Sequence, residues 1–218
     1  MITLTNRLSM VAGLIRDGHP LADIGTDHAY LPVFLLQEGR IPSAAACDVR
    51  EGPLRNAAAT VDTEEVADRV ELLLCSGFDH PRLPEYTDFS MAGMGGNLMV
   101  DLMTAAPFLK AEGIHLVLQP QSHAEDVRDF LYRNGFSILR ETATRDNGRT
   151  YIAIETAFTG DTKDATLSDC FLGKLPESDA PERFDHFRDV LRRLTARQKG
   201  DCACARFFPF SHRDLARG

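Results

Sequence analysis

The segment PLADIGTDHAYLP at Pro20–Pro32 and the apolar run AAACDV that follows it limit the possible folds of this chain more than any other feature. The first apolar stretch ends at Gly25, and the second reaches Asp48, 23 residues later. A strand, a glycine turn, a helix, a second strand and an acid at this interval are typical of one half of a nucleotide-binding α/β unit. We therefore expect the turn to hold a ligand against a helix N-terminus, and Asp48 to accept hydrogen bonds from ribose hydroxyls.

The composition of the turn indicates which ligand fits. A G-x-G-x-x-G turn lets the backbone contact a pyrophosphate, but this turn is DIGTDHA, with Asp27 at the place of the second glycine. A further carboxylate repels a pyrophosphate and suits an ammonium group. S-adenosylmethionine has an α-amino group, a ribose and no phosphate, so we predict it as the cofactor, with Asp27 facing its amino-acid moiety. The alternative is that Asp27 only caps the following helix.

The order of apolar runs predicts an α/β fold. Strands that alternate with helices form a doubly wound, Rossmann-like, mostly parallel sheet. Asn147-Gly148, between two β-rich runs, predicts an antiparallel hairpin that completes a seven-stranded sheet. We expect this sheet in a domain of residues 1–160, followed by a short helical C-terminal region at residues 161–218. The strands are expected at residues 21–25, 44–49, 70–75, 88–91, 114–119, 136–144 and 149–158.

Several helix signals are local. Apolar spacing predicts a helix between residues 4 and 17, with Thr5 as its N-cap, and another over residues 97–109. The S-x-x-E sequence at residues 122–125 predicts a capping box for the helix that follows it.

Composition limits the class of protein. A hydrophobic share of 44% in 218 residues allows one domain with a sizeable core, and no apolar run is long enough for a membrane span. Five irregularly spaced cysteines indicate free thiols in a reducing compartment, so we expect a cytoplasmic protein. Cys202 and Cys204, with His212, suggest zinc, but a closed site needs four ligands, so no metal site is predicted.

The charge is unevenly distributed. The net charge is −8, which argues against general nucleic-acid binding, but residues 183–217 have an excess of five positive charges. We expect a helix in this part to dock through an apolar stripe and to present arginines to phosphate. The stripe comprises Phe184, Phe187, Val190, Leu191 and Leu194, and the arginines are Arg188, Arg192, Arg193 and Arg197.

Two further motifs are expected at the ligand pocket. The glycines of AGMGG at residues 92–96 allow backbone to approach a ligand, although the motif could also be a turn without one. Gln121, after LQP, provides an amide that can donate to and accept from an adenine edge. Tyr30 could stack on a base, and His28 could hold a substrate group or cap the helix.

The motifs together resemble one known family. LTNRLSMVAGLI, LADIGTDHAYLP, CDVREGPLRNA, SMAGMGG, LVLQPQ and NGRTYIAIE occur in this order over residues 4–158, and this pattern resembles the bacterial TrmK family. That family comprises S-adenosylmethionine-dependent enzymes that methylate N(1) of an adenine in tRNA. The chain departs from the family in three places: Ser76 replaces an acid expected near the cofactor adenine, Gln121 replaces an asparagine, and the C-terminal region is shorter.

The resemblance implies an enzyme with S-adenosylmethionine as cofactor and tRNA as substrate, and the residues provide candidates for both. The catalytic candidates are Asp27, His28, Tyr30 and Gln121. The cofactor candidates are Asp23, Gly25, Thr26, Asp27, His28, Asp48, Val49, Ser76, Gly77, Gly93 and Met94. The alternatives are a methyltransferase for another RNA or a small molecule, and a non-catalytic RNA-binding relative.

Overall fold

The structure, a computed structural model, describes residues 2–200, with side chains as far as residue 196. The cysteines and the histidine considered above for zinc therefore lie outside the described residues, as does the side chain of Arg197. No helix in the described part of the chain is both long and apolar enough to cross a bilayer.

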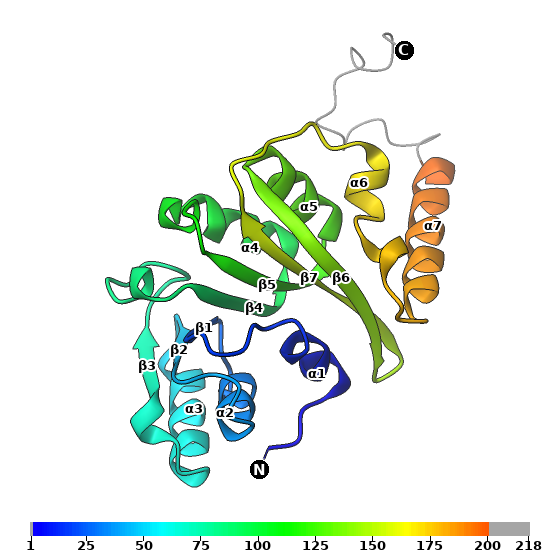
Figure 1. Cartoon of the computed structure of the whole chain (residues 1–218). Helices are drawn as coiled ribbons and strands as arrows, with labels where there is room; N and C mark the ends of the chain where they lie inside the picture. Colours follow the sequence, from blue (N-terminus) through cyan, green and yellow to red (C-terminus); the bar gives the residue numbers. More distant parts are fainter. Residues whose placement is uncertain (1, 201–218) are drawn as a thin grey trace.

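A seven-stranded sheet forms the centre of the molecule, in the order β3-β2-β1-β4-β5-β7-β6 (Figure 1). The first five strands are parallel neighbours, and β7 pairs antiparallel with both β5 and β6. The predicted doubly wound, mostly parallel sheet with a closing hairpin is thus confirmed. The strands are β1 (Leu21–Ile24), β2 (Ala44–Asp48), β3 (Val70–Leu74), β4 (Asp88–Gly95), β5 (His115–Ser122), β6 (Phe136–Asp146) and β7 (Arg149–Phe158).

Helices cover both faces of the sheet. Alternating residues of β1 point to opposite faces, so that Leu21 packs with α1, α2 and α3 while Ala22 packs with α4 and α5. The helices are α1 (Asn6–Ala12), α2 (Tyr30–Gln37), α3 (Glu51–Thr63), α4 (Gly96–Thr104), α5 (Ala124–Arg133), α6 (Leu167–Phe171) and α7 (Arg183–Gly200). Helices on both faces leave the carboxyl ends of the parallel strands open to a ligand.

Three local predictions were wrong or incomplete. Thr5 does cap α1, but the helix ends at Ala12 rather than at residue 17. Helix α4 ends at Thr104, because Pro107 begins a separate short 3₁₀ turn. The predicted capping box does not form: Ser122 is the last residue of β5, and α5 follows a left-handed His123 without a side-chain cap.

The hairpin forms at the predicted place. Asn147 and Gly148 have φ values of 47° and 77°, both left-handed, as the tight two-residue turn between twisted strands requires. The predicted fourth strand is longer than expected, because β4 continues through the AGMGG motif as far as Gly95, with irregular pairing to β5.

The C-terminal region packs on the sheet beside α5 and β6 (Figure 1). Leu175 is fully buried there. Arg128 of α5, also buried, forms an ion pair with Glu141 of β6 at 2.8 Å, and its Nη1 donates to the carbonyl of Cys170 at 2.9 Å. A buried guanidinium therefore joins the C-terminal region to the rest of the fold.

The predicted apolar stripe of α7 docks only in part. Val190 is buried and Phe187 packs on the core, whereas Phe184, Leu191 and Leu194 are exposed.

The predicted arginines of α7 also differ from one another. Arg188 and Arg192 are exposed, as expected, but Arg193 donates to the buried carboxylate of Glu125 at 3.3 Å.

Candidate functional site

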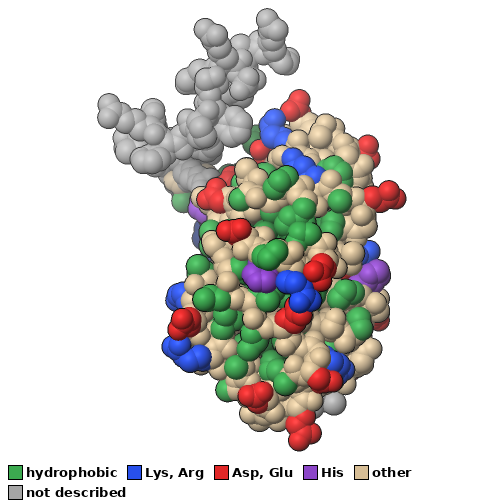
Figure 2. All heavy atoms as spheres, turned by 90° about the vertical axis from the view of Figure 1, so that its left-hand side faces the viewer, with side chains coloured by type: hydrophobic (Ala, Val, Ile, Leu, Met, Phe, Trp, Pro, Cys, Tyr) green, Lys and Arg blue, Asp and Glu red, His purple; other side chains and the backbone are tan. Residues whose placement is uncertain are grey.

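A cavity of about 380 Å³ lies at the carboxyl ends of β1, β2, β3 and β4. The parallel order of these strands brings residues far apart in sequence to this edge. Seven of the predicted cofactor residues line it: Gly25, Asp48, Val49, Ser76, Gly77, Gly93 and Met94. Figure 2 shows the side of the molecule at the β3 edge, where hydrophobic side chains gather in patches between charged ones. The exposed Val49 and Leu98 belong to the lining of the cavity.

Asp48 ends β2 with its carboxylate at this cavity. Its Oδ1 accepts a hydrogen bond from the backbone N–H of Arg50 at 2.8 Å, which fixes the orientation of the group. No residue of the described chain donates a hydrogen bond to the other oxygen, Oδ2. The side chain of Asp48 is only 10% exposed. Because the bond to Oδ1 holds the carboxylate in one orientation, Oδ2 is an oriented acceptor at the edge of a largely apolar cavity.

Glycine is needed at two places around the cavity. Gly25 has φ +79°, and a Cβ there would lie 2.1 Å from Cε of Met94. Gly77 has φ +58°, and a Cβ there would lie 2.4 Å from Cδ2 of Leu102. Both turns therefore bring bare backbone against side chains that line the cavity.

Asp23 and Thr26 lie beneath the turn rather than in the cavity lining. Asp23 accepts a hydrogen bond from the hydroxyl of Ser90 at 2.7 Å, and Thr26 accepts one from the N–H of Ala29 at 3.1 Å. Burial raises the pKa of Asp23, while the hydroxyls of Ser90 and Thr26 oppose this rise. These two residues fix the shape of the turn.

Asp27, His28 and Tyr30 lie on the outer side of the same turn. His28 Nε2 is 3.5 Å from Asp27 Oδ2, and the rings of His28 and Tyr30 stack with centroids 4.9 Å apart. Asp27 does not cap α2, since the helix follows a left-handed Ala29 without a side-chain cap. The turn thus presents a carboxylate beside an aromatic platform, but the three side chains do not line the cavity.

A buried network that the sequence analysis missed holds Gly93. The Oε1 of Gln119, which is fully buried, accepts from the N–H of Gly93 at 3.1 Å and from Nη1 of Arg7 at 2.9 Å. A Cβ at Gly93 would lie 3.4 Å from Arg7 Nη1 and 3.5 Å from Nε2 of Gln121. The exposed Gln121 therefore lies next to Gly93, although it is not among the residues that line the cavity. The sequence signal that could have identified Gln119 is an amide residue within an otherwise apolar strand.

Two free thiols also contribute to the cavity lining. Cys47 ends the apolar part of β2, and Cys75 follows β3; both are buried. The neighbouring thiol of Cys75 raises the pKa of Cys47, and burial acts in the same direction. The neighbouring thiol of Cys47 lowers the pKa of Cys75, although burial opposes it. Cys75 is therefore the more readily ionised thiol.

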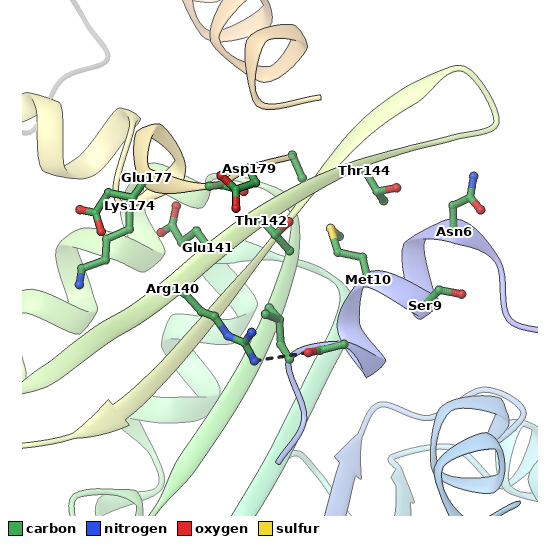
Figure 3. Close-up of a pocket in the computed structure, with 14 residues that line it drawn as sticks. Asn6, Ser9, Met10, Arg140, Glu141, Thr142, Thr144, Lys174, Glu177 and Asp179 are labelled. Carbon is green, nitrogen blue, oxygen red and sulfur yellow. Dashed lines mark hydrogen bonds between the residues drawn. The ribbon is translucent and has the colours of Figure 1, made fainter. Parts of the chain in front are cut away.

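A larger cavity, of about 690 Å³, lies between α1, β6 and residues 174–179 (Figure 3). Its lining combines basic Arg140 and Lys174 with acidic Glu177 and Asp179, and Arg140 Nη2 donates to the carbonyl of Gly13 at 3.3 Å. None of the predicted site residues lines it. Because the lining carries both positive and negative side chains, it favours no single class of ligand.

Comparison with known proteins places these features in a family. A sequence model described as a methyltransferase domain matches residues 4–154. A Bacillus subtilis relative, tRNA (adenine(22)-N(1))-methyltransferase, is 29% identical over 150 residues, which are 69% of this chain and 63% of that protein. A Mycoplasma pneumoniae relative is 31% identical over 69% of this chain and 70% of its own length. This chain thus spans less than two thirds of the Bacillus subtilis protein.

Solved structures agree with this placement. A Streptococcus pneumoniae protein in complex with S-adenosyl-L-methionine has a TM-score of 0.81 and 26% identity, with 92% of this chain and 94% of that one covered. A Streptococcus agalactiae protein of the NADB-Rossmann superfamily has a TM-score of 0.81 and 27% identity, with 91% and 88% covered. The chain therefore belongs to the TrmK family of class I, S-adenosylmethionine-dependent methyltransferases.

Proposed function

We propose that this chain binds S-adenosylmethionine and transfers its methyl group to N(1) of an adenine in tRNA. The observation that carries the proposal is the carboxylate of Asp48, which the N–H of Arg50 orients at the strand-end cavity, in a chain similar to a tRNA (adenine(22)-N(1))-methyltransferase. In this proposal residues 1–160 bind the cofactor and perform the transfer, and the enzyme acts in the cytoplasm. The C-terminal region of residues 161–218 is an appendage that is helical in its described part, as far as residue 200.

The lining of the cavity fits this cofactor. Asp48 Oδ2 would accept from the ribose hydroxyls, and the Ser76 hydroxyl would meet the adenine amine. Leu102 offers an apolar contact to the adenine ring, and the bare backbone at Gly25 and Gly93 leaves room for the methionyl end. The carboxylate of Asp27, on the adjacent turn, would attract the α-ammonium group.

The reaction requires no strong base or acid from the protein. When bound, the cofactor supplies a methyl group on a sulfonium, which is already electrophilic, and the lone pair of adenine N(1) needs no deprotonation. The side chains must therefore align the acceptor, at about 3–3.5 Å from the methyl carbon, and exclude water. In our proposal the His28–Tyr30 platform stacks on the base and the Gln121 amide holds its edge. The Asp27 carboxylate stabilises the cationic product.

The base must be accessible before it can react. A paired or stacked adenine has to be turned out of its helix, at a cost of a few kcal/mol. The exposed position of Tyr30, which is 43% exposed, supports a role in receiving such a base.

The test is mass analysis of tRNA nucleosides after incubation with the protein and a methyl-labelled cofactor. We expect labelled 1-methyladenosine in tRNA and none without the protein. Calorimetry with the cofactor accompanies the assay. Cofactor binding without any labelled nucleoside would refute the proposed substrate, and binding of NAD with none of the methyl donor would refute the proposed cofactor.

A further inference from the structure

The tip of the β6–β7 hairpin and helix α7 line a third, basic cleft of about 630 Å³. Four arginines line it, two from the hairpin and two from α7: Arg145, Arg149, Arg188 and Arg192. All four are exposed, with side-chain exposures of 62% for Arg145, 71% for Arg188 and 77% for Arg192. Two elements that are far apart in sequence thus direct guanidinium groups to one cleft.

The acidic residues of the cleft do not neutralise these arginines. Asp185 contacts both Arg188 and Arg145, the latter at 3.9 Å, and Asp189 contacts Arg192 at 3.0 Å. Arg149 has no ion-pair partner among residues 2–200. Four guanidiniums against two carboxylates leave an excess of two positive charges, although the whole chain has a net charge of −8.

These ion pairs are easily exchanged for another anion. Solvent-exposed pairs of this kind contribute about 0–1 kcal/mol. Each guanidinium has five N–H donors in a planar fork that matches a phosphate, so even a paired arginine can donate to a second anion. The cleft therefore has the chemistry of a phosphate-binding surface.

Hydrogen bonds also connect the cleft to the candidate active site. The Asn6 side chain donates to the carbonyl of Arg145 at 3.0 Å, and the N–H of Arg7 contacts the carboxylate of Asp146 at 3.4 Å. Arg7 in turn donates to Gln119, which holds Gly93 at the cofactor cavity. A continuous set of contacts thus runs from the hairpin tip through the start of α1 to the candidate active site.

We propose that the cleft between the β6–β7 hairpin and α7 binds the phosphodiester backbone of the substrate RNA. This inference rests on the proposed function and extends it, since it assigns RNA binding to four named arginines on two elements. The hairpin arginines belong to the methyltransferase fold, so the RNA contact is shared between that fold and the C-terminal region. Bound there, the backbone is held on the side of the molecule where the acceptor base must enter.

The test compares two double variants, Arg145→Gln with Arg149→Gln and Arg188→Gln with Arg192→Gln, with the wild type. The control is Arg82→Gln, because Arg82 is also an exposed, paired arginine but lies beside β3, at the opposite edge of the sheet. RNA affinity is measured by fluorescence anisotropy with a tRNA transcript at several salt concentrations. Calorimetry with S-adenosylmethionine reports on the intact cofactor site.

We expect each double variant to lower the slope of log affinity against log salt by about two units, one for each lost phosphate contact. Binding at low salt should weaken roughly tenfold or more. Cofactor affinity should stay at the wild-type value, and Arg82→Gln should match the wild type in both assays.

An unchanged salt slope in both double variants would overturn the inference. So would a wild type that binds no RNA, in which case the proposed substrate fails as well. If RNA binds through these arginines but no methylated adenosine forms, the proposed function fails and the cleft remains an RNA-binding surface.

Discussion

Replacement of Asp48 is the most direct test of how the cofactor binds. The carboxylate is held by the N–H of Arg50 through Oδ1, which leaves Oδ2 for the ribose. Hydrogen bonds to a charged acceptor contribute about 1.5–3 kcal/mol, and 1.36 kcal/mol corresponds to a tenfold change in affinity. Asp48→Ala should therefore weaken S-adenosylmethionine binding by roughly 10- to 150-fold.

A second substitution separates charge from shape. Asp48→Asn keeps an oxygen for the N–H of Arg50, and its amide can still contact a ribose oxygen, but without charge. Neutral hydrogen bonds contribute about 0.5–1.5 kcal/mol, so the loss of affinity should be clearly smaller than in the alanine variant.

The assay is calorimetric titration of each variant with S-adenosylmethionine. Glu51→Ala is the matched control, because Glu51 is a nearby acid with a 74% exposed side chain that is absent from the cavity lining. The control should bind as the wild type does. Wild-type affinity in Asp48→Ala, with the thermal unfolding of the free protein also unchanged, would refute the placement of the ribose at Asp48.

Three further predictions follow from the same structure. Ser76→Asp should strengthen cofactor binding, since a charged acceptor replaces a hydroxyl near the expected adenine amine; a marked loss in calorimetry would mean that this loop is arranged differently. Cys75 should react with a small alkylating reagent faster than Cys47, because its pKa is lowered by the neighbouring thiol, and bound S-adenosylmethionine should protect it. Mass mapping of the labelled thiols checks this, and equal labelling with and without cofactor would contradict it. Burial lowers the pKa of His186 to about 4 from the ordinary 6.5, so the unfolded chain takes up the proton first as the pH falls. The contribution of neutral His186 to the free energy of unfolding should be fully present above pH 6.5 and should fall by at most about 3 kcal/mol between pH 6.5 and 4. Urea unfolding should show a flatter pH dependence in His186→Gln than in the wild type. Identical profiles would argue against the buried neutral histidine.

The strands were predictable because their signals are local. A parallel strand that is buried on both faces is an apolar run, as in Ala44–Asp48, and needs no partner to be recognised. The left-handed Asn147-Gly148 turn is similarly encoded by two adjacent residues. The position of Asp48 at the cavity follows from these local signals, because the carboxyl ends of parallel strands meet at one edge.

Other parts of the site depend on contacts between distant residues. The bond from Arg7 to Gln119 spans 112 positions, and neither residue has a local signal that pairs it with the other. The capping box at residues 122–125 failed for a related reason. Ser122 pairs with Gly95 of β4, and this sheet contact extends β5 through the residue that would have capped the helix.

The buried guanidinium of Arg128 has a consequence for the order in which the protein can fold. Its partner Glu141 lies 13 positions after Arg128, but the carbonyl of Cys170, which accepts from Nη1, lies 42 positions after Arg128. A nascent chain that has emerged only to residue 160 contains all seven strands and still lacks this acceptor. In such a chain the guanidinium of Arg128 stays open to solvent, and an exposed ion pair with Glu141 contributes only about 0–1 kcal/mol. The buried ion pair, and the stability that it gives the sheet, therefore form only after residues 170–173 have been made and cover Arg128.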